Sequence, residues 1–320
     1  MIHYSDIIYV GSNKPLICRD GNIQYANSMD LKFYSYEELD INIDPVTNTK
    51  VIIFDIAVGW TTLKDMDIIE KFVKQSNSRS SLFTKSVFIR LVDQFEHQGS
   101  NEIYLIMRKI STDYNIPIIR TYDVNYYDLP NQLDYIPYPY IEDDEITRNT
   151  RVANRVILSG ASVKGIYPMR EKLYEISNGS CLIETLDHPG YSGRYWSSGK
   201  IGNDYIDKLS HYYFMICTTC NESYELLKYI ECAEAGCIPV GEIPNSLKGT
   251  EAENYIIQVP DSALINGDEF DKWFSDISLN TDYHRISTSY RRCIKEMRDK
   301  NKIKDNLLNI INNEIYKRSK

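Results

Sequence analysis

One stretch decides the fold of this chain: Tyr212-Tyr-Phe-Met-Ile-Cys-Thr-Thr-Cys-Asn-Glu-Ser-Tyr-Glu-Leu-Leu-Lys-Tyr-Ile-Glu-Cys-Ala-Glu-Ala-Gly-Cys-Ile-Pro-Val-Gly241. Its apolar start at 212–217 predicts a buried strand, and the leucine and isoleucine spacing that follows predicts a helix over 222–235. Gly236 is the expected helix stop, and 237–241 predicts a second strand. So short a connection places the two strands parallel in one sheet, joined by a right-handed crossover.

The polar loop after the first of these strands is the predicted ligand site, and it contains Thr219 and Asn221. It lies at the carboxyl edge of the sheet, where open α/β folds bind ligands, and the free N–H groups of the following helix suit a diphosphate. Within that helix, Lys228 and Glu231 are i, i+3 neighbours and close enough to pair. Their spacing fits a surface ion pair, and it also fits a lysine for phosphate beside a carboxylate for ribose hydroxyls.

Strand-like apolar runs alternate with helical stretches in both halves of the chain. Examples are 6–10, 51–57 and 87–92 in the first half, and 155–159 and 180–185 in the second. Such alternation predicts parallel sheets that are covered on both faces.

A segment rich in proline and tyrosine, 122–145, separates the two halves and is typical of an interdomain connection. The sequence therefore predicts an α/β protein of two doubly wound, Rossmann-like domains that face each other across a cleft. We expect an N-terminal domain over 1–145, a C-terminal domain over 146–300, and a final helix over 301–320 that can pack back on the N-terminal domain.

The net charge of −9 argues against a nucleic-acid-binding groove, which would need a basic face. The last forty residues run the other way, with 11 basic and 5 acidic side chains. This segment is either a solvated helix face or a weak contact with an anionic membrane surface or a polyanionic acceptor. The N-terminus has no cationic leader, and no apolar run approaches the about 20 residues of a membrane helix. We therefore expect a soluble, cytoplasmic protein.

Seven cysteines, an odd number, suit a reducing compartment better than a disulfide framework. Cys217, Cys220, Cys232 and Cys237 have the spacing of two metal-ligand pairs. Their predicted placement on strands and a helix, however, scatters the sulfurs away from the single point that tetrahedral zinc requires. We therefore expect free thiols and no metal site.

The run Lys228-Tyr-Ile-Glu231 followed by Ala235-Gly-Cys-Ile-Pro-Val240 resembles the signature of the GT-B glycosyltransferases. In that fold a glutamate five residues before a glycine, followed by small-x-Pro-Val, contacts the ribose of the donor. Glu231 and Gly236 match this spacing, and the resemblance implies that Lys228 meets phosphate charge. Many retaining members have a Glu-x7-Glu pair whose first glutamate would fall on Ser223, and Glu222 is one residue away from that position.

A second match comes earlier in the chain, at Leu158-Ser-Gly-Ala-Ser-Val-Lys-Gly-Ile-Tyr-Pro-Met-Arg170. It resembles the opening strand and loop of the donor domain in family-1-like bacterial and viral glycosyltransferases. The resemblance implies that the backbone of Gly160 approaches the ligand and that Lys164 and Arg170 support the diphosphate.

The turn His188-Pro-Gly-Tyr191 also resembles this group. Histidine is the side chain whose ordinary pKa lies near neutrality, so His188 could move a proton or hold a phosphate. Tyr191 and Arg194 could reach the same cleft. By itself, a histidine in a turn fits a structural role equally well.

In such a fold the N-terminal domain binds the acceptor and supplies any catalytic base. Asp55 and Asp93 lie at the ends of predicted strands, at the sheet edge where such groups act. Each also fits an ordinary turn or capping residue.

The resemblance implies transfer of a sugar, hexosyl or pentosyl, from a nucleotide-sugar donor to a saccharide or other hydroxyl acceptor, without metal or cofactor. A nucleotide-sugar epimerase of the same shape is the nearest alternative among enzymes. A non-catalytic carbohydrate-binding protein on a degenerate transferase fold is the alternative from another class.

Overall fold

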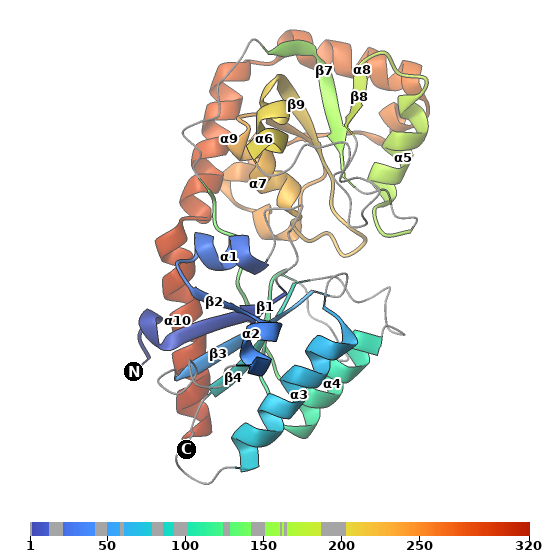
Figure 1. The fold of residues 1–320 in the computed structure, drawn as a ribbon. Helices are drawn as coiled ribbons and strands as arrows, with labels where there is room; N and C mark the ends of the chain where they lie inside the picture. The colour runs from blue at the N-terminus through green and yellow to red at the C-terminus, as the bar shows by residue number, and fades with distance from the viewer. Residues whose placement is uncertain are drawn as a thin grey trace. The chain divides into compact units, whose positions relative to one another are not determined.

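The computed structural model describes residues 2–12, 22–41, 50–57, 61–78, 86–92, 102–123, 129–141, 151–160, 162, 165–186 and 203–320. The chain divides into two compact units (Figure 1). Unit 1 comprises Met1–Pro139 together with Lys300–Lys320, and unit 2 comprises Tyr140–Asp299. The chain therefore passes from unit 1 to unit 2 and back again.

Unit 1 is built on a parallel sheet whose six described strands run in the order β2-β1-β3-β4-β5-β6. The central strands β1 and β3 are buried at every residue, as expected for a sheet covered on both faces. The strands are β1 (Ile7–Gly11), β2 (Lys32–Ser35), β3 (Val51–Ile56), β4 (Ser86–Leu91), β5 (Ile118–Arg120) and β6 (Gln132–Tyr135).

Helices cover both faces of this sheet, with α3 and α4 on one side and α10 on the other (Figure 1). They are α1 (Asn22–Ser28), α2 (Tyr36–Ile41), α3 (Leu63–Ser78), α4 (Glu102–Asp113) and α10 (Lys300–Arg318), with a short 3-10 turn at Tyr4–Asp6. Helix α10 buries Ile303, Leu307 and Ile311. Its Lys300 and Lys304 both pair with Asp30, so the final helix is an integral part of unit 1.

Unit 2 has a second parallel sheet, whose five described strands run in the order β11-β10-β9-β7-β8. They are β7 (Val152–Ser159), β8 (Ile183–Leu186), β9 (Tyr212–Cys217), β10 (Ile238–Gly241) and β11 (Ile257–Gln258). The helices are α5 (Pro168–Ser177), α6 (Asn203–Ser210), α7 (Leu227–Glu234), α8 (Gly267–Asn280) and α9 (Tyr283–Met297), with 3-10 turns at Asn245–Leu247, Glu251–Tyr255 and Asp261–Leu264. In the core, Phe214 on β9 packs edge to face against Phe274 of α8, with ring centroids 5.0 Å apart.

The sequence prediction of an α/β protein with parallel sheets is confirmed. The decisive stretch forms β9, α7 and β10, and β9 and β10 pair in parallel.

The helix in that stretch begins later than predicted, at Leu227 instead of 222. Ser223 has a left-handed backbone, with φ +57°, which an α-helix does not accommodate. Its carbonyl accepts a hydrogen bond from the N–H of Asn245, so a distant loop holds the segment out of the helix. The loop after β9 is therefore longer than the sequence indicated, and its first residues are not the start of α7.

Candidate functional site

Polar side chains gather at the carboxyl edge of the sheet in unit 2, where β7, β9 and β10 end. We call them the edge cluster. Its members are Ser159, Gly160, Arg170, Tyr205, Thr218, Thr219, Lys228, Glu231 and Glu242. The edge is the place where open parallel sheets bind their ligands.

Lys228 and Glu231 form a buried ion pair on α7. The Nζ of Lys228 lies 2.7 Å from Oε2 of Glu231, and the two side chains are only 10% and 9% exposed. Burial opposes the charge on Lys228, but the neighbouring Glu231 carboxylate outweighs it and raises the pKa of the ammonium above its ordinary value. The structure therefore excludes the surface ion pair that the spacing alone allowed.

A hydrogen-bonded chain anchors this pair to the sheet. The ammonium of Lys228 donates to the hydroxyl of Tyr205 on α6, at 2.6 Å. That hydroxyl also lies 2.5 Å from Oγ of Ser159, the last residue of β7. Burial raises the pKa of Tyr205 to about 12, so the phenol stays neutral and does not compete with Glu231 for the positive charge.

Two cationic side chains, those of Arg170 and Lys228, approach Gly160. This residue has φ +114°, and a Cβ placed on it would lie 2.8 Å from Nη1 of Arg170 and 3.3 Å from Cε of Lys228. Any side chain here would displace both cations, which explains the need for glycine. Arg170, 4% exposed, is held by a 2.9 Å hydrogen bond from its Nε to Oγ1 of Thr218.

Glu242 is the member of the cluster that the sequence analysis missed. It follows β10 directly, and its Oε2 accepts a hydrogen bond from the N–H of Thr219 at 2.8 Å. Burial raises its pKa, although the hydrogen bonds from Thr219 and the charge of Arg170 oppose that rise. The rule that selected Thr219, a polar residue just after a buried parallel strand, applies equally to Glu242 and could have found it.

Asn221 and Glu222 lie farther along the loop after β9, outside the hydrogen-bonded chain of the cluster. The side-chain amide of Asn221 donates to the carbonyl of Gly165, which ties this loop to the one before α5. Oε2 of Glu222 accepts from the thiol of Cys220 at 3.2 Å. The structure therefore gives both predicted donor residues contacts within loops at the same edge.

Gly236 lies elsewhere, at the amino-terminal edge of the sheet, just before β10. Its φ is +67°, and the guanidinium of Arg151 donates to its carbonyl and to that of Ala235. These contacts cap the end of α7. That edge carries an open cleft of ≈ 750 Å³, lined partly by Arg151, Tyr213 and Gly236. Gly236 therefore lies at the far end of α7 from Gly160, and the structure does not bring these two predicted donor residues together.

Five predicted site residues fall outside the part of the chain that the structure describes. They are Asp93, Lys164, His188, Tyr191 and Arg194.

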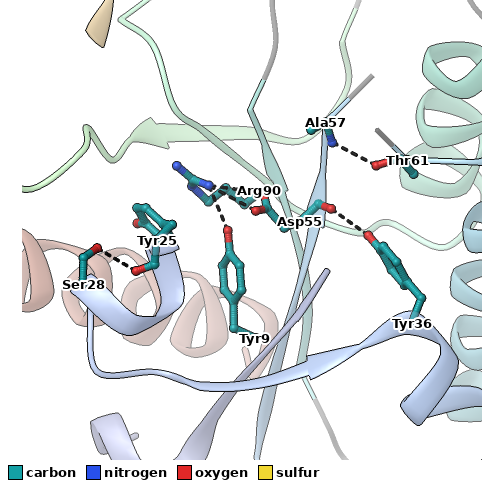
Figure 2. Close-up of polar contacts among 8 residues, drawn as sticks. All are labelled: Tyr9, Tyr25, Ser28, Tyr36, Asp55, Ala57, Thr61 and Arg90. Carbon is teal, nitrogen blue, oxygen red and sulfur yellow. Dashed lines mark hydrogen bonds and ion pairs between the residues drawn. The ribbon is translucent and has the colours of Figure 1, made fainter. Parts of the chain in front are cut away.

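The remaining predicted residue, Asp55 in unit 1, is fully buried (Figure 2). Nη1 of Arg90 lies 3.2 Å from its Oδ1 and also donates to the hydroxyl of Tyr9 at 2.8 Å. The Arg90 guanidinium stacks on Tyr25, with Cζ 3.5 Å from the ring centroid. A catalytic base must reach the proton that it takes. Asp55, enclosed and paired, has instead a structural role in this arrangement.

Among the described residues, no group of three or more His, Cys, Asp or Glu side chains is arranged to hold a metal. The six described cysteines are free, and Cys217, Cys220, Cys232 and Cys237 are buried. None of the helices in the described part of the chain combines the length and the apolar character that a bilayer crossing requires.

No protein-family model matches the chain, and no curated protein matches it by sequence. By structure, it is similar to the crystal structure of TarM, with a TM-score of 0.51 and 11% identity over 87% of this chain and 57% of TarM. It also matches the crystal structure of the GtfA/B complex, with a TM-score of 0.44 and 9% identity over 78% of this chain and 60% of that one. The chain thus spans less than two thirds of the length of either. Both neighbours are glycosyltransferases. The parallel sheets and the likeness to TarM show that the chain has a Rossmann-like α/β fold of the GT-B type.

Proposed function

We propose that this protein is a glycosyltransferase and that its edge cluster binds the nucleotide-sugar donor. One observation carries the proposal: Arg170 and Lys228 converge on Gly160, a residue with no side chain, at the carboxyl edge of a parallel sheet. Two fixed cations beside a glycine suit a diphosphate, because no side chain stands between them and charge-assisted hydrogen bonds to phosphate are the strong ones.

The ribose would lie against Glu231. A carboxylate is an acceptor and binds hydroxyl donors, whereas it repels phosphate oxygens. Lys228 holds the Glu231 carboxylate at 2.7 Å, so the acceptor for the ribose and the cation for the phosphate are positioned by a single contact.

Catalysis in this proposal comes from holding donor and acceptor in line and from stabilising the departing diphosphate by charge. The two side-chain cations supply that charge, so we propose a reaction that needs no divalent metal. The acceptor, a saccharide or another hydroxyl compound, would bind to unit 1. Asp93 and His188 stay the predicted residues for proton transfer.

The experiment is calorimetric titration of UDP, GDP, ADP and CDP into the wild-type protein and into Glu231→Gln. The substitution keeps the size but removes charge-assisted hydrogen bonds of about 1.5–3 kcal/mol each, so the affinity for the preferred nucleotide should fall at least about tenfold.

The matched control is Glu175→Gln, which alters another i, i+3 Lys–Glu pair in unit 2. There Lys172 and Glu175 are 3.0 Å apart but on the surface, at 45% and 60% exposure. This variant should bind as the wild type does. Equal nucleotide affinities of Glu231→Gln and wild type would contradict the proposal that Glu231 binds the ribose.

Turnover distinguishes the alternatives once the preferred nucleotide is known. Nucleotide release that depends on an added saccharide supports transfer. An altered nucleotide sugar formed without an acceptor would instead indicate an epimerase, and saccharide binding without turnover would indicate a non-catalytic protein.

A further inference from the structure

The backbone of Glu242 is fixed on both sides. Gly241 before it has φ +154°, and a Cβ there would lie 2.0 Å from the carbonyl oxygen of Cys217, so only glycine fits. The N–H of Glu242 donates to that same carbonyl at 3.0 Å. Its own carbonyl accepts from the hydroxyl of Tyr229 at 2.8 Å. The chain therefore turns sharply at the end of β10 and sets the direction of the Glu242 side chain.

Thr219 fixes the carboxylate of Glu242 by donating hydrogen bonds from its backbone N–H and its hydroxyl. A carboxylate has about four acceptor positions, so positions are left for a ligand. Glu242 is also only half-buried, which leaves it accessible from solvent.

The contacts within the edge cluster link its charged groups one to the next. Glu231 lies against Lys228, and both Lys228 and Arg170 approach Gly160. Arg170 in turn binds Thr218, the next residue Thr219 binds Glu242, and the charge of Arg170 acts on Glu242. Followed through these contacts, the groups are carboxylate, cation, glycine, cation, carboxylate.

A nucleotide sugar has the matching order: a ribose with hydroxyls, two phosphates, and a sugar with hydroxyls. Carboxylates accept hydrogen bonds from hydroxyls, and cations bind phosphates. With the ribose at Glu231 and the diphosphate at Lys228 and Arg170, Glu242, the carboxylate that senses the charge of Arg170, would meet the sugar.

We infer that Glu242 binds hydroxyl groups of the sugar to be transferred and so helps to select that sugar. The inference rests on the proposed donor site. It assigns to Glu242 a part of the donor that a free nucleoside diphosphate lacks, and this difference makes it testable.

The experiment compares a nucleoside diphosphate with the same diphosphate carrying a sugar. The two candidate pairs are UDP with UDP-glucose and GDP with GDP-mannose, and the pair that the wild type binds more tightly is used. In Glu242→Gln the affinity for the diphosphate should stay within about twofold. The ratio of the dissociation constants, nucleotide sugar over diphosphate, should rise about tenfold. In Glu231→Gln both affinities should fall together.

Glu242→Asp is the second variant, because it keeps the charge and shortens the reach. It should show a ratio between those of wild type and Glu242→Gln, and melting curves should show all three proteins folded. An equal loss for both ligands in Glu242→Gln, or no loss for either, would overturn the inference while leaving the donor site standing. A wild type that binds none of UDP, GDP, ADP and CDP would remove the donor site, and the role of Glu242 with it.

Discussion

At the residue scale, Glu242 is a carboxylate on which burial outweighs the groups that favour its charge. Burial raises its pKa, and the hydrogen bonds from Thr219 and the charge of Arg170 lower it by less. The pKa of Glu242 therefore lies above its ordinary value of 4.5. Ionisation of Glu242 is thus harder in the folded protein than in the unfolded chain.

This shift predicts a pH dependence of stability. Below about pH 4.5, Glu242 is protonated in both states and has no effect. As the pH rises through its raised folded pKa, the unfolded chain ionises more easily and the wild type loses stability. Glu242→Gln removes this loss, so its melting temperature relative to wild type should rise as the pH increases above about 4.5. A difference that stays flat over this range, or that shrinks as the pH rises, would contradict the shift.

Asp55 shows what sequence reasoning misses at this scale. The pattern placed an aspartate near a strand end, which is correct, since β3 ends at Ile56. The partner that neutralises it, Arg90, is 35 residues away and is brought opposite by the parallel register of β3 and β4. Only the pairing of strands reveals it, because no local rule links the two residues.

At the element scale, the strand–helix–strand unit of β9, α7 and β10 could be predicted from apolar spacing, but the start of α7 could not. The spacing of apolar residues does not reveal the contact with Asn245, whose N–H donates a hydrogen bond to the carbonyl of Ser223 and keeps it in the loop. The start of β8 differs for a similar reason. A strand was predicted from 180, but β8 begins at Ile183, because the backbone of 181–182 donates to Asp271 of α8.

Asp271 therefore provides a test at this scale. Its carboxylate accepts hydrogen bonds from the Ser180 hydroxyl and from the N–H groups of Cys181 and Leu182. Asp271→Ala removes the acceptor that these donors share, although the N–H of Leu182 keeps a 3.1 Å hydrogen bond to Oγ of Ser180. It should lower the free energy of unfolding by about 1–3 kcal/mol. Amide hydrogen exchange at Cys181 should quicken.

The matched control lies on the same helix. Within the part of the chain that the structure describes, the Asp276 carboxylate accepts a hydrogen bond from the side chain of Asn280, on the surface. Asp276→Ala should change the stability by no more than about 0.5 kcal/mol. Similar losses in the two variants would show that Asp271 does not fasten α8 to the turn before β8.

At the scale of the whole molecule, the alternation of apolar runs was enough to predict two Rossmann-like units. Contacts between residues that are far apart in the sequence decide which unit contains α10. Its Asn312, for example, accepts a hydrogen bond from the N–H of Ile2, 310 residues away. A periodic apolar pattern predicts that a helix is buried, but not against which unit.

The place of α10 predicts that unit 1 is sensitive to changes at the end of the chain. Leu307 is 2% exposed, so Leu307→Ala should lower the free energy of unfolding of unit 1 by about 2–5 kcal/mol. Nucleotide affinity should be retained, because the edge cluster belongs to unit 2. Leu279→Ala, at a residue that is 85% exposed, is the control and should have little effect. Loss of nucleotide binding in Leu307→Ala at temperatures where it stays folded would contradict this separation.

The return of the chain to unit 1 at Lys300 also sets the order in which a ribosome can complete the protein. Domains fold as units as they are synthesised, the earlier ones first. Here the first 139 residues emerge without α10, the helix of unit 1 whose Ile303, Leu307 and Ile311 are buried. Unit 2, which is continuous from Tyr140 to Asp299, is made in full before that helix exists. Unit 2 is thus the first to be translated in full, and unit 1 stays incomplete, with part of its apolar surface uncovered, until residues 300–320 are translated.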